Sequence, residues 1–521
     1  MDDIKSDLLI IGGGIAGCVA ALKAASNDLN VVLITKEKNP VECNSYYAQG
    51  GIVYESKDDS TRKLKDDIMK AGDGVNYPPA VDVLVNEGPR LVKEYLIDQA
   101  GVPFNRDSEG ELDFTEEAAH SVKRIIHVDD YTGQAIESAL MKLIEKNSEI
   151  TVYTERVVID LLTEHKHTDN LLSVYKKPTC IGAYVLDVKE NKVDAFLAKV
   201  TVLATGGLSR IFLYTTNTNG ATGDGFAMAH RAEAQLINME YVQFHPTAFR
   251  YEDSKCFLIS ESLRGEGAVL KTPEGEEFMK KYHPDGSLAP RDIVSRAIHN
   301  EMSENKYPNV LLDIASYMEA DKIKERFPKI YSTCLSQGLD ISIKPIPVVP
   351  AAHYACGGIK ADLWGRTNVN RLYAIGEVSC TGVHGANRLA STSMLECLVW
   401  GDRAVRKILD DRKFYLDYKP PKVNEWVYTG VEEPDIALIS QDMNVLRYLM
   451  WNYVGLDRTG DRLKRAYEDL QHLQRDIEEF YRNAKLTREL IELRHAVQTG
   501  VLVEQAAWKN KRSLGCHFRR S

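Results

Sequence analysis

The spacing of hydrophobic positions along the N-terminal half predicts several buried strands. An uncharged run at 8–22, LLIIGGGIAGCVAAL, is too short to cross a bilayer and contains a glycine cluster in its middle. It predicts a buried strand that turns directly into a buried helix. Short runs rich in β-branched or apolar residues at 31–36, 199–207 and 371–377 predict further strands of the same kind.

A different spacing governs the C-terminal part. Apolar residues recur every three or four positions through the segment 462–481, which predicts an amphipathic helix. The segments 439–456 and 486–506 are predicted to be its partners, so we expect a three-helix bundle. Core packing explains the apolar stripe better than partner binding, because most amphipathic helices simply bury their stripe. The stripe consists of Leu463, Ala466, Tyr467, Leu470, Leu473, Ile477 and Phe480.

Three glycines between the first predicted strand and helix fit the pattern G-x-G-x-x-G: Gly12, Gly14 and Gly17. The first allows a tight turn, the second lets a pyrophosphate approach the backbone, and the third lets the helix pack closely. The helix N-terminus favours a phosphate there. The pattern suits FAD or NAD. Thr35-Lys36 replaces the acidic residue usual after the second strand, which disfavours a plain NAD dehydrogenase; a turn without a ligand is the other alternative.

Composition narrows the class of protein. The 521 residues suffice for two or three domains, and 65 basic against 75 acidic residues argue against a nucleic-acid surface. Nine scattered cysteines without a CxxC pair indicate a reducing compartment rather than a disulfide scaffold or a metal site. The first residues, MDDIKSD, lack the basic region of a signal peptide. We therefore expect a cytoplasmic protein that binds no metal, membrane or nucleic acid.

Five segments in the middle of the chain carry candidate chemistry. Each places His, Arg, Ser or Glu beside Gly or Pro, as loops that build sites often do. One such residue alone is more often structural than catalytic, but five segments are hard to dismiss. The segments are 240–249, 258–270, 288–298, 350–359 and 384–401.

The motifs in these segments resemble a known family. YAQGG (47–51), QFHPT (243–247), APRDIV (289–294), PAAHY (350–354) and HGANR (384–388) occur in the order found in the flavoproteins of succinate dehydrogenase and fumarate reductase. The resemblance runs from about residue 5 to residue 410 and continues more loosely beyond. Within the family the chain most resembles the members that oxidise L-aspartate.

The resemblance implies an α/β fold of three parts. Residues 1–238 and 346–418 would form an FAD-binding domain of the glutathione-reductase type, which is Rossmann-like. Residues 239–345 would form an inserted α+β capping domain, whose hinge motion would open and close the site, and 422–521 the C-terminal three-helix bundle. The proline-rich stretch 344–350 is predicted to be a rigid linker back into the first domain.

Site residues follow from the same resemblance. His245, His353 and Arg388 would clamp the two carboxylates of a four-carbon acid, since a guanidinium suits a carboxylate. Ser260 and Glu261 would face the substrate. Arg291 matches the proton-transfer arginine of the family, although a pKa above roughly 12 makes arginine a poor base. A third electrostatic clamp is therefore the alternative role for Arg291.

FAD is the implied cofactor, held noncovalently. Asn44 stands where many succinate dehydrogenases and fumarate reductases carry a histidine bonded to the flavin, and an amide cannot make that bond. Glu377 would accept a hydrogen bond from a ribose hydroxyl. The predicted cofactor-binding residues are Gly12, Gly13, Gly14, Ile15, Ala16, Gly17, Lys36, Asn44, Ser45, Tyr46, Tyr47, Ala48, Gln49, Gly50, Gly51, Asp224, Glu377, Ser393 and Met394.

The stretch FTEEAAHS, residues 114–121, distinguishes among substrates. Glu117 matches a glutamate that the L-aspartate-oxidising members place near the substrate ammonium. Alanines at 118 and 119 replace the usual glycines and disfavour positive φ, which leaves a displaced Glu117 open. Glu116 is a second candidate, and a solvated acidic turn is the plain alternative.

The implied reaction is FAD-dependent oxidation of L-aspartate to iminoaspartate, with oxygen, which yields hydrogen peroxide, or fumarate as the electron acceptor. The product would pass to quinolinate synthase, as the first step of de novo NAD biosynthesis. The main alternative is a soluble fumarate reductase or succinate dehydrogenase flavoprotein, against which Asn44 and Glu117 speak. A reductase of another enoate and an inactive flavin-bound scaffold are further alternatives.

Overall fold

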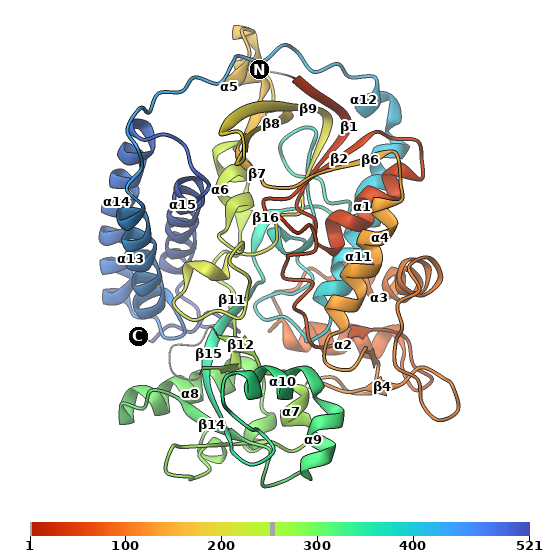
Figure 1. The fold of residues 1–521 in the computed structure, drawn as a ribbon, viewed down its shortest axis with the longest axis vertical. Helices are drawn as coiled ribbons and strands as arrows, with labels where there is room; N and C mark the ends of the chain where they lie inside the picture. The colour runs from red at the N-terminus through yellow and green to blue at the C-terminus, as the bar shows by residue number, and fades with distance from the viewer. Residues whose placement is uncertain (1–2, 118, 251–255, 521) are drawn as a thin grey trace.

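The computed structural model describes residues 3–117, 119–250 and 256–520, and its largest sheet has the predicted Rossmann-like order (Figure 1). The sheet order is β6–β2–β1–β9–β8–β7, with β17 also beside β9. β1 lies between β2 and β9 and runs parallel to both, which confirms the predicted strands at 31–36, 199–207 and 371–377. The bounds are β1 Asp3–Ile11, β2 Val31–Ile34, β6 Ile150–Tyr153, β7 Arg156–Thr163, β8 Cys180–Asp187, β9 Lys192–Leu203 and β17 Leu372–Ala374.

Two of the fingerprint glycines are required by close backbone contacts. Gly12 has φ +113°, and a Cβ there would lie 2.1 Å from the carbonyl oxygen of Ala204, which follows β9. A Cβ at Gly17 would lie 2.0 Å from the carbonyl oxygen of Gly12. Only glycine therefore lets β1 turn into helix α1 (Ile15–Ala25) while β9 passes beside the turn.

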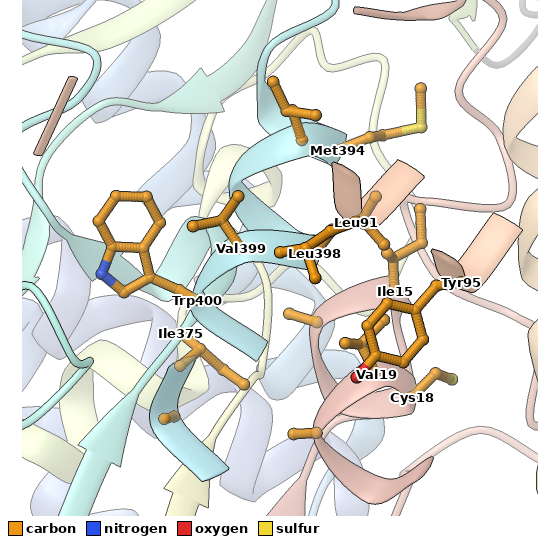
Figure 2. Packing of buried hydrophobic residues seen from close by; sticks show 14 of the residues in the cluster. Ile15, Cys18, Val19, Leu91, Tyr95, Ile375, Met394, Leu398, Val399 and Trp400 are labelled. Atoms are coloured by element: carbon orange, nitrogen blue, oxygen red, sulfur yellow. The ribbon is translucent and has the colours of Figure 1, made fainter. Parts of the chain in front are cut away.

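Side chains of β1 alternate between two cores, as a strand period of two requires. Leu8 and Ile10 face helices α1, α3 (Pro78–Leu91), α4 (Thr132–Glu145) and α11 (Ser393–Asp410). Leu9 and Ile11 face the opposite core. In Figure 2, Ile15 and Val19 of α1 lie beside Leu398 of α11, and Trp400 is fully buried in the same cluster. These helices fix the start of α1, where the predicted phosphate site lies.

An inserted unit with its own sheet and core lies at the lower end of the molecule in Figure 1. Its order is β12–β11–β15–β14–β13. β11 and β15 pair antiparallel, so the chain leaves and returns along neighbouring strands. The elements are β11 Val242–Phe249, β12 Phe257–Leu258, α7 Ser262–Gly265, β13 Val269–Lys271, α8 Arg291–Asn305, β14 Val310–Asp313, α9 Ala320–Arg326, α10 Pro328–Ser336 and β15 Ile346–Ala355. The exact domain limits given above remain predictions.

The linker predicted at 344–350 is wrong, because Pro347 and Pro350 lie within β15. Between the pairs His245 with Ala351 and Ala248 with Val349 the register shifts, so that two residues of β11 oppose one of β15. This is a β-bulge, the place where a sheet tolerates prolines that lack an N–H. The bulge directly follows His245 and so shapes the strand that carries it.

The C-terminal helices form the predicted bundle: α13 (Ile436–Val454), α14 (Gly460–Asn483) and α15 (Arg488–Lys509) pack on one another. The predicted stripe of α14 is buried except for Tyr467, which is 47% exposed, and Phe480, which is partly buried. Helix α15 packs against α6 (Asp224–Arg231), on the side of the large sheet opposite α11 (Figure 1). The bundle therefore lies against the nucleotide-binding unit.

Within the described ranges, no helix is both long and apolar enough to cross a membrane. The same ranges contain no group of three or more His, Cys, Asp or Glu side chains suited to a metal ion. The nine cysteines all lie in the described part of the chain, and all are free thiols.

Candidate active site

A single large cavity collects most of the predicted site residues. All seven predicted catalytic and substrate residues line it: Glu117, His245, Ser260, Glu261, Arg291, His353 and Arg388. The predicted cofactor residues that line it are Gly12–Ala16, Lys36, Asn44, Ser45, Tyr47–Gly51, Asp224, Glu377, Ser393 and Met394. The cavity therefore extends from the glycine turn at 12–14 to the arginines Arg291 and Arg388.

Two predicted cofactor residues do not line the cavity. Tyr46 packs edge-on against Tyr47, with 5.2 Å between the ring centroids. Gly17 contacts the backbone of Gly12 and serves the packing of α1. Direct contact of these two residues with the cofactor therefore stays a prediction that the lining of the cavity does not support.

Several residues that line the cavity were not predicted from the sequence. The glycine- and asparagine-rich run 216–221 precedes Asp224 and carried a recognisable loop signal. Glu37 follows Lys36 directly and was passed over as an acidic residue near the end of β2. Arg156 and Val158 lie on β7 and belong to no recognisable sequence motif. These missed lining residues also include Cys43, Thr205, Gly206 and Cys397.

The N-terminal end of α1 is prepared for an acceptor ligand. Its N-cap residue, Gly14, contributes no capping side chain, and the backbone N–H of Ile15 makes only a long contact of 3.4 Å to Ser45 Oγ. A helix start with free N–H groups favours a phosphate. Four buried polar atoms of lining residues also lack a partner: Gln49 Oε1, Thr205 Oγ1, Asn217 Nδ2 and Arg388 Nε. Buried groups of this kind call for a ligand.

An ion-pair network holds the end of the cavity near Lys36. Lys36 Nζ lies 2.7 Å from Asp224 Oδ2 and 2.9 Å from Glu492 Oε1 of α15. Arg488, also on α15, donates to Glu37 Oε1 at 2.6 Å. Burial alone would raise the pKa of Asp224, but Lys36 and His495 lower it overall. The C-terminal bundle therefore supplies charges to the cofactor cavity.

At the other end, Glu261 joins two arginines. It follows β12 and accepts hydrogen bonds from Arg264 at 2.7 Å and from Arg291, the first residue of α8. Burial would raise the pKa of Glu261, but the two guanidinium groups lower it overall, so the carboxylate is ionised. Arg264 is itself 1% exposed and also donates to the carbonyl oxygen of Ser287 at 2.7 Å. Arg264 was not among the residues predicted from the sequence, although it lies within the candidate segment 258–270.

Two histidines and an arginine complete this group. The rings of His245 on β11 and His353 on β15 have centroids 5.3 Å apart. Burial, and then nearby arginines, lower the pKa of both imidazoles well below the usual range, so both are neutral. Arg388 lies over the ring of Tyr354 at 4.5 Å and donates to Gln243 Oε1 at 3.2 Å. The positive charge thus comes from guanidinium groups, and the histidines offer neutral hydrogen bonds.

Glu117 lies in the same cavity, and the loop that carries it is fixed. Its carboxylate is 8% exposed, whereas Glu116 is exposed, which decides between the two candidates for position. The loop connects β4 (Phe114–Thr115) with β5 (Ile125–Ile126). His120 contacts the carbonyl oxygen of Ala390 at 3.1 Å through Nε2. The solvated acidic turn is therefore excluded for Glu117.

The backbone at Ala119 shows in part whether alanines in place of glycines displace Glu117. Ala119 adopts φ +69°, the left-handed conformation that glycine prefers, and yet Glu117 still reaches the cavity. Ala118 lies outside the described residues. A left-handed conformation of this kind costs a non-glycine residue on the order of 1–2 kcal/mol. Burial raises the pKa of Glu117, and Arg291 partly opposes the shift.

Ser260 lines the cavity beside this group. It is 5% exposed, and its hydroxyl lies 2.8 Å from Ser262 Oγ. Thus cap strands and helix α8 supply His245, Ser260, Glu261 and Arg291, while the 384–401 segment supplies Arg388. The site lies where the inserted unit meets the nucleotide-binding unit.

Comparison with known proteins identifies the family. The model of the FAD binding domain matches residues 7–394, and that of the fumarate reductase flavoprotein C-terminus matches 443–521. L-aspartate oxidase of Pseudomonas aeruginosa is 42% identical, covering 99% of this chain and 95% of its own length. L-aspartate oxidase of Halobacterium salinarum is 40% identical, covering 99% and 97%. The solved E. coli quinol fumarate reductase has a TM-score of 0.88 at 27% identity, covering 100% of this chain and 92% of that one.

These matches agree with the geometry described above. The fold prediction is confirmed by the fumarate reductase structure, and the cofactor prediction by the FAD binding domain. The residues present fit FAD: an uncapped helix start suits its pyrophosphate, and the unpaired buried polar atoms suit its other polar groups. The chain belongs to the L-aspartate oxidase family of FAD-binding flavoproteins.

Proposed function

We propose that this chain oxidises L-aspartate to iminoaspartate, with oxygen or fumarate taking the electrons. One observation carries the proposal beyond family membership: a buried carboxylate, Glu117, shares the substrate end of the cavity with Arg291 and Arg388. A plain dicarboxylate such as succinate gains nothing from a third carboxylate. An amino dicarboxylate does, because its ammonium needs an anionic partner when water is excluded.

The guanidinium groups bind the two substrate carboxylates. Arg388 and Arg291 supply charge, and neutral His245 and His353 add hydrogen bonds without a further desolvation cost. Ser260 offers a hydroxyl at the same end. Interactions with both carboxylates fix the direction in which Cα–H points, and orientation of this kind accounts for much of an enzyme's rate gain.

FAD, when bound, supplies the acceptor for the hydride that leaves Cα. The hydride carries both electrons and one proton away from Cα, and the second proton leaves the ammonium, so the product is protonated iminoaspartate. With oxygen as acceptor, the same electrons and protons yield hydrogen peroxide. With fumarate as acceptor they yield succinate. Arg291 would then carry the proton, since Glu261 holds the Arg291 guanidinium group beside Arg264.

The finer predictions are retained as part of this proposal. Asn44 accepts hydrogen bonds from Thr218 and offers no ring nitrogen, which supports noncovalent FAD. Iminoaspartate would pass to quinolinate synthase as the first step of NAD biosynthesis. Nine free thiols suit a reducing, cytoplasmic location. The domain limits 1–238 with 346–418, 239–345 and 422–521 are proposed with them, and the cap as the part that moves.

The test is anaerobic flavin reduction, followed by bleaching of the flavin absorbance. The holoprotein is mixed with L-aspartate and, separately, with succinate, and both are repeated with Glu117→Gln. We expect rapid bleaching of the wild type by aspartate, little by succinate, and loss of this preference in the variant. Equal bleaching of the wild type by succinate would instead favour the fumarate reductase alternative.

A further inference from the structure

Ser391, whose side chain holds Glu117 in place, was not among the site residues predicted from the sequence. Ser391 Oγ donates a hydrogen bond to Glu117 Oε2 at 2.9 Å, across 274 residues of sequence. Both side chains are 8% exposed. A hydrogen bond from a hydroxyl to a buried carboxylate is among the stronger kinds, because the acceptor is charged.

The backbone of Ser391 is strained and fixed at the same time. Its φ is +57°, a left-handed conformation that a non-glycine residue rarely adopts. Its carbonyl oxygen accepts from the backbone N–H of Val53 in β3 (Ile52–Val53), and the next side chain, Thr392, donates to the carbonyl oxygen of Leu389. Strain of this type persists where neighbouring contacts enforce it, and it concentrates at functional sites.

Gly50 leaves room for the other oxygen of the same carboxylate. A Cβ at Gly50 would lie 2.7 Å from Glu117 Oε1 and 3.6 Å from Ser391 Oγ. The carboxylate therefore sits between the Gly50 backbone and the Ser391 hydroxyl. With Oε2 occupied by Ser391, Oε1 keeps lone pairs for a cation in the cavity.

The segment that carries Ser391 also carries its neighbours in the site. Arg388 lies three residues before it, and Ser393, which accepts from Arg388 Nη1 at 3.2 Å, lies two residues after it. Ala390 contacts His120 of the Glu117 loop. One short stretch thus fixes a carboxylate clamp, the loop of Glu117 and the direction of its carboxylate.

We propose that Ser391 is a positioning residue: it turns the Glu117 carboxylate toward the substrate ammonium and so sets the preference for an amino dicarboxylate over a plain one. This inference rests on the proposed function. Removal of the hydroxyl leaves a buried carboxylate with one fewer donor, which favours its neutral form and frees its rotation. Selectivity is then lost even though every group that touches substrate is intact.

The first variant is Ser391→Ala, assayed with L-aspartate and succinate. We expect kcat/KM for aspartate to fall roughly tenfold or more, while flavin reduction by succinate stays unchanged. The acid limb of the aspartate pH profile should move to higher pH. Ser391→Asn, which tolerates positive φ and restores an N–H donor, should recover part of the loss. Ser393→Ala is the matched control and should weaken both substrates alike.

A double variant separates this inference from the proposed function. Adding Ser391→Ala to Glu117→Gln should cost nothing further, because the residue acts only through Glu117. A similar loss for aspartate and succinate in Ser391→Ala would overturn the inference and indicate a general structural role, as would an unchanged aspartate preference. If Glu117→Gln alone keeps its preference, the proposed function fails whatever Ser391 does.

Discussion

Helix α15 should control how tightly the protein holds FAD, and Arg488 is the residue with which to test this. Its guanidinium donates to Glu37 Oε1 at 2.6 Å, to Glu37 Oε2 at 3.2 Å and to the carbonyl oxygen of Lys36 at 3.0 Å. Lys36 and Glu37 both line the cofactor cavity. In Arg488→Met the stem remains packed, but the end of the cavity near Lys36 loses its fixed charges.

The expected loss can be estimated from these contacts. A hydrogen bond to a charged group contributes about 1.5–3 kcal/mol when buried. The side chains of Arg488 and Glu37 are 22% and 20% exposed, so solvent screening reduces this value. We expect the variant to lose about 1–2 kcal/mol of FAD binding, which corresponds to roughly a fivefold to thirtyfold higher Kd.

The assay is an FAD titration of apoprotein, followed by flavin fluorescence quenching. Arg494→Met is the matched control: it removes an arginine of the same helix that pairs with Glu478 and Asp160, neither of which lines the cavity. Both variants should lose thermal stability, but only Arg488→Met should raise the Kd. Equal Kd values for the two variants would refute the reasoning and leave the bundle a purely structural part.

Two further changes test the loop of Glu117. Burial lowers the pKa of His120 to about 4, so the unfolded chain takes up this proton first as the pH falls. The free energy of unfolding of the wild type should therefore drop by about 3 kcal/mol between pH 6.5 and 4 because of His120. Urea titrations of His120→Gln over the same pH range should show a shallower drop. An equal drop in both proteins would contradict this expectation. Gly50→Ala places a Cβ against Glu117 Oε1, so kcat/KM for aspartate should fall roughly tenfold. Wild-type values in steady-state kinetics would exclude this contact.

Much of the fold could be predicted because its signals are local. The glycine fingerprint, the β-branched strands and the stripe of α14 each depend on residues adjacent in sequence. The linker at 344–350 failed for the opposite reason. Prolines predict the end of a strand, because they cannot donate to the hydrogen-bond ladder of a sheet. Only the pairing of β15 with β11 shows that a β-bulge accommodates Pro350.

The candidate site likewise contains residues that local motifs predict and residues that they do not. The catalytic and substrate residues that the motifs name, such as His245 and Arg388, all line the cavity. Their partners are distant in sequence and carry no motif: Ser391 meets Glu117 across 274 residues, and Arg488 meets the backbone of Lys36 across 452. Ala119 shows a further limit, since its φ of +69° is not what an alanine predicts.

Charge balance explains why a pocket for an anion contains carboxylates. Three buried or nearly buried guanidinium groups, Arg264, Arg291 and Arg388, surround the substrate end, opposed by Glu117 and Glu261. The neutral histidines add no charge, so the protein presents one net positive charge there. L-aspartate carries one net negative charge and makes the closed site neutral, whereas succinate carries two and leaves an unbalanced anion. An unbalanced charge is costly where water is excluded, so we expect Glu117 to select against the plain dicarboxylate as well as for the ammonium.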